Sequence, residues 1–113
     1  MVQAVERYRR ADNAGKGSTA DALDKTPCSV DDVCEAKRAC TAVSDPTARA
    51  LALKNEVEIG LAEMHAHKLE PDDPRARALP DKLDEAERLL TTGHDALPAC
   101  DEKLMGLKRH YGI

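Results

Sequence analysis

Four cysteines constrain this chain more than any other residues, and three of them, Cys28, Cys34 and Cys40, follow one another at intervals of six. The fourth, Cys100, stands alone near the C-terminus. The 113-residue chain has no Trp, no Phe and only two Tyr, so each buried side chain removes little apolar surface from water. An even cysteine count in a small chain with a thin core is typical of disulfide-stabilised proteins. We therefore expect two disulfides.

The C-terminal third has an apolar residue at every seventh position, which predicts a helical second arm over residues 75–111. Pro80 suits the first ordered turn, because proline is tolerated there. Pro98 lacks a backbone donor and Gly93 is a poor helix former, so a kink is expected over residues 93–98. The seam consists of Ala76, Leu83, Leu90, Leu97, Leu104 and Tyr111.

Residues 28–69 predict the first arm of a hairpin, made of a helix over 29–44 that can run almost straight into another over 46–69, with a bend at Pro46. Ser29 is the expected N-cap of the first helix, and Asp45 followed by Pro46 begins the second. The second helix has two apolar stripes, which predicts neighbours on both of its sides. The sequence EPDDP at residues 70–74 is a turn signal that reverses the chain.

The N-terminal residues 1–27 carry a weaker pattern, a helix from Val2 to about Asn13 followed by a Gly- and Ser-rich loop over residues 13–21. Together these elements predict a single all-α domain over residues 1–113. It is a small helical bundle, built as a long antiparallel hairpin that disulfides staple, with an additional N-terminal helix.

The helix prediction decides which cysteines can pair. Within one helix Cys34 and Cys40 lie about 9 Å apart along the axis, whereas the Cα atoms of a disulfide lie within about 7 Å. A bond from Cys28 to Cys40 spans an even longer distance, so Cys28 with Cys34 and Cys40 with Cys100 remain. A turn near residue 71 also places Cys40 opposite about residue 103. One alternative stays open: if Thr26 caps the helix, Cys28 is helical and its bond to Cys34 becomes too long.

Metal binding is a second use of such residues. The cysteines lack the paired C-x-x-C spacing of zinc sites, and we expect no resident metal or cofactor. The weak alternative is a metal-responsive protein that uses Glu63, His65 and His67, because Glu63 and His67 share a helix face. A histidine near a helix C-terminus is also what the helix dipole favours.

Charge and motif content exclude several functions. The net charge is −4 with both signs interspersed, so the chain has no basic field for nucleic acid. There is no run of about 20 apolar residues that could span a membrane, and no catalytic constellation is recognisable. We expect a non-enzymatic interaction or structural module, periplasmic, secreted or lipid-anchored, that binds an unidentified protein or its own copy. Residues MVQAVERYRR lack the apolar core of a secretory signal, so oxidised cysteines imply a leader removed ahead of Met1.

Overall fold

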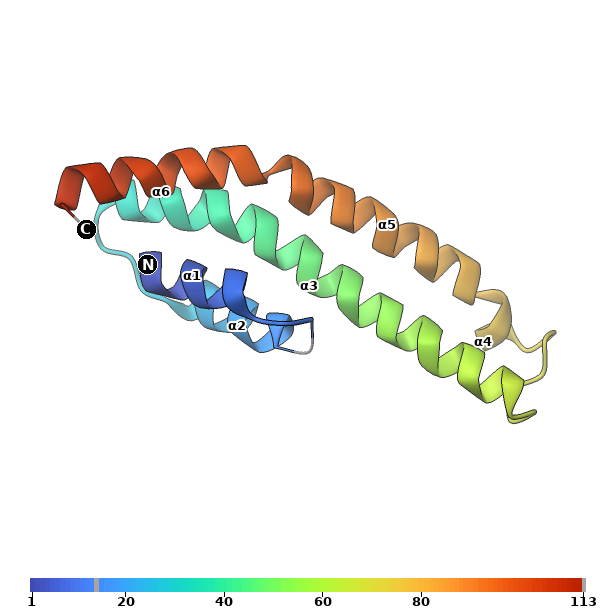
Figure 1. The fold of residues 1–113 in the computed structure, drawn as a ribbon. Coiled ribbons are helices and arrows are strands. Elements are labelled where there is room, and N and C mark those ends of the chain that lie inside the picture. Colours follow the sequence, from blue (N-terminus) through green and yellow to red (C-terminus); the bar gives the residue numbers. More distant parts are fainter. Residues whose placement is uncertain (14, 113) are drawn as a thin grey trace.

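A computed structural model describes residues 1–13 and 15–112, and within them every regular element is a helix, which confirms the all-α prediction. The longest helix, α3, lies antiparallel to α5 and α6, while α1 and α2 form a shorter hairpin beside it (Figure 1). The helices are α1 (Val2–Arg10), α2 (Lys16–Lys25), α3 (Asp31–His65), α4 (Pro74–Arg77), α5 (Leu79–Asp95) and α6 (Leu97–Tyr111).

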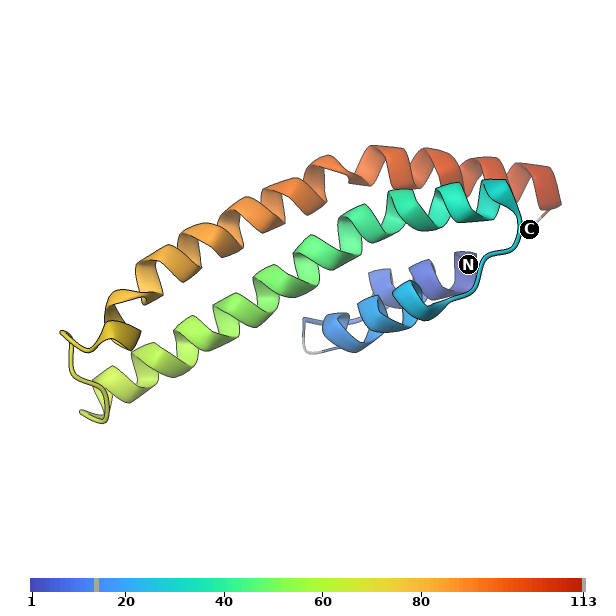
Figure 2. The same cartoon turned by 180° about the vertical axis from the view of Figure 1, so that it is seen from behind.

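The molecule is a rod of 58 × 20 × 20 Å with two unlike halves. The base consists of α1, α2, α6, residues 31–47 of α3 and residues 90–95 of α5. The arm consists of residues 48–65 of α3, α4 and residues 79–89 of α5. In both views α1 and α2 run beside the base only (Figures 1 and 2), so the arm is two helices wide.

Two disulfides hold the base together, and they are the predicted pairs. Cys28 and Cys34, with Cα atoms 5.3 Å apart, fasten the chain that leads into α3. Cys40 and Cys100, 4.6 Å apart, join α3 to α6. The second bond lies within the hydrophobic core, whose larger members include Val5, Tyr8, Leu23, Val43 and Leu104.

The first arm is one helix rather than two, because α3 runs through Asp45 and Pro46 for 35 residues, which is the nearly straight continuation that the sequence left open. A proline inside a helix loses one backbone hydrogen bond. Here α2, α5 and α6 pack against α3 and hold the turns on either side of Pro46 in place. The helix therefore curves without breaking (Figure 1).

The start of α3 also differs from the prediction. Val30 rather than Ser29 is the N-cap, and no side chain caps the helix. The first turn contains Asp31 and Asp32, and the positive end of the helix dipole stabilises their negative charges. Because α3 begins at Asp31, Cys28 lies outside it, which removes the alternative in which Thr26 caps the helix.

The predicted loop over residues 13–21 is wrong as well. Residues 16–25 form α2, and α1 ends at Arg10 rather than Asn13; Ala14 lies outside the described residues. Gly, Ser and Thr have low helix propensity, but Ala20 and Leu23 are buried in the core. Packing against α3 therefore outweighs the weak local preference.

The kink predicted in the second arm is confirmed at Ala96, between α5 and α6, with Pro98 in the first turn of α6. Pro80 lies in the first turn of α5, also as predicted. Gly93 has a different role, because it is buried inside α5. A Cβ atom there would lie 2.5 Å from Thr47 Oγ1 and 3.0 Å from the Val43 carbonyl oxygen. Gly93 thus permits the close approach of α5 to α3.

Candidate functional site

The C-terminus of α3 separates the histidines of the proposed metal cluster. The helix ends at His65 rather than Leu69, and His67 has a φ of 59°. The His67 amide donates to the Met64 carbonyl at 3.1 Å, and the Lys68 amide donates to the Glu63 carbonyl at 2.8 Å. This pattern is a Schellman motif, in which the left-handed residue is usually glycine. His67 therefore ends the helix instead of extending its face.

Replacing His67 with glycine is expected to stabilise the protein by about 0.5–1 kcal/mol, because glycine adopts the left-handed conformation without a Cβ penalty. Urea unfolding of the two proteins measures the difference. His67→Ala is the control and should be no more stable than the parent. If His67→Gly is also no more stable, the Schellman assignment is wrong.

The structure does not bring Glu63, His65 and His67 together as metal ligands. Glu63 pairs with Arg75 at 2.9 Å, and His65 and His67 are exposed. Within residues 1–13 and 15–112, no three His, Cys, Asp or Glu side chains are arranged to hold a metal ion. All four cysteines are in disulfides, so the chain offers no thiolate for metal or redox chemistry.

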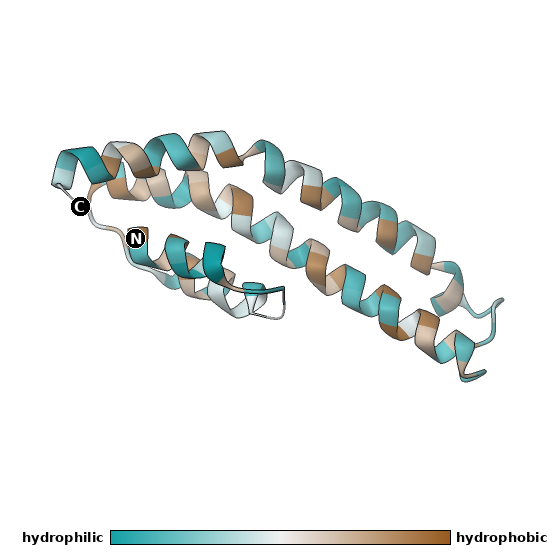
Figure 3. Ribbon diagram, in the orientation of Figure 1, coloured by the Kyte–Doolittle hydropathy of each residue, from teal (hydrophilic) through white to brown (hydrophobic). Residues whose placement is uncertain are grey.

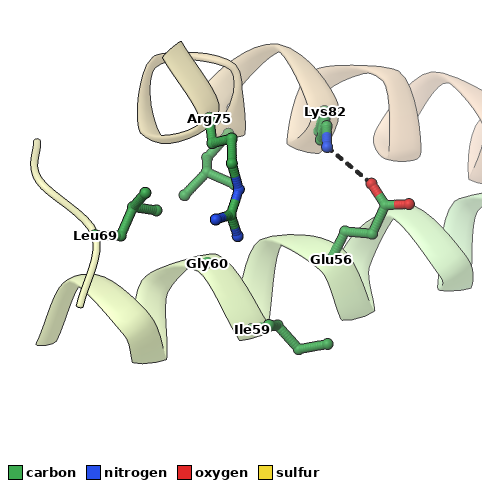
Figure 4. Close-up of a pocket in the computed structure, with 7 residues that line it drawn as sticks. Glu56, Ile59, Gly60, Leu69, Arg75 and Lys82 are labelled. Atoms are coloured by element: carbon green, nitrogen blue, oxygen red, sulfur yellow. Dashed lines mark hydrogen bonds and ion pairs between the residues drawn. The ribbon is translucent and has the colours of Figure 1, made fainter. Parts of the chain in front are cut away.

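A small cleft lies at the tip of the arm, where α4 and α5 face α3 (Figure 4). It measures about 250 Å³. Arg75 and Lys82 reach toward α3, where Lys82 pairs with Glu56 at 2.9 Å and Arg75 pairs with Glu63. The other lining residues are Ile59, Gly60, Leu69 and Leu79. Each cation is paired with a carboxylate of α3, so these ion pairs join the two sides of the arm.

The arm exposes large apolar side chains that the sequence assigned to covered faces. Leu61 is 55% exposed, Ile59 50% and Leu83 38%. Sequence periodicity predicted neighbours for both apolar stripes of the second helix of the first arm. In the structure, only one side of this part of α3 meets α5. Hydrophobic residues recur along this part of α3 (Figure 3). Scattered exposed apolar residues are ordinary, whereas exposed apolar residues that form one contiguous patch are typical of a binding surface.

Three carboxylates meet where α2 packs on α3. Burial, a hydrogen bond with Asp24, and the negative charges of Asp24 and Asp21 raise the pKa of Asp45 to about 6. Asp45 was expected to cap a helix, but it lies in the middle of α3. Its raised pKa means that the folded state holds a proton that the unfolded chain releases near pH 4. The associated stability is complete below pH 4 and is lost as pH rises through 6.

Asp45→Asn is therefore expected to be more stable than the parent at pH 7.5 and equal to it at pH 4. Asp45 is exposed, so screening limits the gain to a few tenths of a kcal/mol. Thermal unfolding across this pH range measures it. Asp84→Asn, on an exposed position of α5, is the matched control without contact to α2. An equal response of the two variants would contradict the role of Asp45.

No protein-family model, curated protein or solved structure matches the chain. Among the described residues, no helix combines the length and apolarity that crossing a membrane requires.

Proposed function

We propose that the protein is a non-enzymatic interaction module, secreted or periplasmic, that binds a partner protein through its arm. The observation that carries this proposal is the exposure of Ile59, Leu61 and Leu83 on a segment only two helices wide. A partner helix laid along one side of the arm would bury the apolar side chains on that side, and burying each would contribute roughly 1–2 kcal/mol.

The two disulfides support a secreted or periplasmic location. Disulfides persist in oxidising environments and are rare in the cytosol, and both bonds of this chain lie in the base. The buried bond between Cys40 and Cys100 fixes the end of the hairpin opposite to its turn.

The arm is held in one conformation, which supports a role in binding rather than as a flexible linker. Ion pairs from Lys82 to Glu56 and from Arg75 to Glu63 span the two sides of the arm near its tip. The rod is 58 Å long, so the base holds the arm out where a partner can reach it. An arm held in one conformation loses little entropy on binding.

Site-specific photo-crosslinking in the producing cells tests this proposal. A photoreactive residue is placed at position 59, 61 or 83, one at a time. Positions 59 and 61 differ by about 200° around α3, so the set samples different sides of the arm. We expect at least one of these positions to give a discrete protein adduct, and an adduct of twice the chain mass would identify a second copy as the partner.

Control positions are Asp84 and Glu87, which are exposed on α5 and polar. They should give no discrete adduct. The proposal is wrong if positions 59, 61 and 83 give no adduct, or if the control positions give the same one.

A further inference from the structure

A groove lies in the base, at the point where five helices meet. Tyr8 and Arg9 come from α1, Lys16 from the start of α2, Val43 and Thr47 from α3, and the remaining lining from the junction of α5 and α6. Its volume is about 430 Å³, which falls within the range of small-molecule sites between helices. The α5–α6 residues are Leu90, Gly93, His94 and Leu97.

The floor of the groove is apolar. Val43 is 7% exposed and Tyr8 5%, and Leu90 and Leu97 are half-buried walls. Burial raises the pKa of the Tyr8 phenol, so this side chain is neutral at physiological pH. An alkyl or aryl group laid along this floor would leave water without leaving a buried charge unpaired.

The rim is basic although the chain as a whole has a net charge of −4. Arg9, Lys16 and His94 line it, and no Asp or Glu is among the lining residues. Arg9 pairs with Asp101 on α6, which lies outside the groove. Lys16 Nζ lies 4.4 Å from the centre of the Tyr8 ring and donates to the Tyr8 carbonyl oxygen at 3.1 Å.

Lys16 is the strongest anion-binding candidate in this rim. Its ammonium group has three donors, only one of which is used by the Tyr8 carbonyl, and no ion pair of Lys16 is found among the described residues. Asp45 acts on Tyr8 but lines a different groove beside Arg49. A ligand anion would therefore meet a cation with free donors and no competing carboxylate in the lining.

We propose that this groove binds a small amphipathic anion, an apolar chain that ends in one carboxylate or phosphate. The chain lies on Val43, Leu90 and Leu97, and the anionic group accepts hydrogen bonds from Lys16. This site is in the base and is separate from the partner surface proposed on the arm.

Calorimetric titration below the micelle concentration tests the inference with decanoate and decyl phosphate. At least one of them should bind with a stoichiometry of one. Decyl trimethylammonium has the same chain with the opposite charge, decanol has no charge, and acetate and inorganic phosphate have no chain. All four should bind at least about tenfold more weakly, a difference of 1.4 kcal/mol. Comparing decanoate with decyl phosphate shows whether the groove prefers a carboxylate, as in a fatty acid, or a phosphate group.

Lys16→Glu should weaken binding at least tenfold, whereas Lys25→Glu, the same charge change on α2 outside the groove lining, should leave the affinity unchanged. Lys16→Gln removes the charge without reversing it and serves if Lys16→Glu does not fold. Methyl NMR gives a second readout, because Leu90 and Leu97 should shift on titration while Leu61 and Leu83 on the arm should not. Absence of saturable binding by both anions, equal binding of the decyl cation, or undiminished affinity of both Lys16 variants would overturn the proposal.

Discussion

Replacing Cys40 and Cys100 together with alanine is expected to destabilise the protein by about 4 kcal/mol. The bond joins residues 60 apart in sequence, so its removal lets the unfolded chain explore many more conformations. Both residues are 2% exposed and lie in the core, so their loss also leaves a small cavity. Thermal unfolding should show a drop in Tm of roughly 10–20 °C for a chain of this length.

Cys28→Ala with Cys34→Ala is the matched comparison. This bond closes only a six-residue separation, so the same chain-entropy argument gives about 2 kcal/mol. Loss of the buried, long-range bond between Cys40 and Cys100 should therefore lower the free energy of unfolding more than loss of the bond between Cys28 and Cys34. Equal losses in the two double variants, or a larger loss for the Cys28 and Cys34 variant, would contradict this prediction.

Gly93→Ala is expected to destabilise the protein by about 1–3 kcal/mol, although alanine is the better helix former by about 1 kcal/mol. The added Cβ would lie 2.5 Å from Thr47 Oγ1 and 3.0 Å from a backbone oxygen of α3. A hydroxyl can rotate, but a backbone carbonyl inside a helix can move only if the helices separate. Urea unfolding gives the change in the free energy of unfolding.

Two other glycines control for helix propensity. Gly106, on α6, has nothing within 4 Å of the added Cβ, so Gly106→Ala should stabilise by about 0.5–1 kcal/mol. In Gly60→Ala the atom nearest to the added Cβ is the end of the Leu79 side chain, at 2.8 Å; because that side chain can move, this variant should cost less than Gly93→Ala. If Gly93→Ala is as stable as Gly106→Ala, the close approach of α5 to α3 is not as described.

The sequence predicts the hairpin and its disulfides because both depend on spacings along the chain. The apolar seam with Pro98 locates the second arm and its kink, and the turn near residue 71 places Cys40 within reach of Cys100. Helix geometry then excludes a bond between Cys34 and Cys40. These inferences need only helix rise and side-chain period.

The predicted helix bounds differ from the structure where tertiary packing, rather than local sequence, determines the conformation. Residues 16–25 have weak helix propensity, and only contact with α3 makes them a helix. Pro46 is a normal helix boundary in sequence, yet neighbouring helices hold α3 together there. His67 is one of the residue types enriched in the left-handed conformation, but no glycine follows His65 to indicate where the helix ends.

The two proposed binding surfaces could not be read from the sequence for a related reason. The basic groove combines residues from α1, α2, α3 and the α5–α6 junction, so Lys16 and Leu97 become neighbours only in the folded chain. The arm surface depends on where α1 and α2 stop covering α3. Leu61 and Leu83 fit the same apolar pattern as buried residues, and only the fold leaves them exposed.

The most direct test of this account is the oxidation state of the cysteines in the producing cells. Rapid acid quenching, followed by a maleimide polymer that adds mass to each free thiol, reports it on a gel. We predict no added mass before reduction and a shift of four polymers after it, one for each cysteine. Modification of all four cysteines before reduction would contradict a disulfide-stapled module that works in an oxidising compartment.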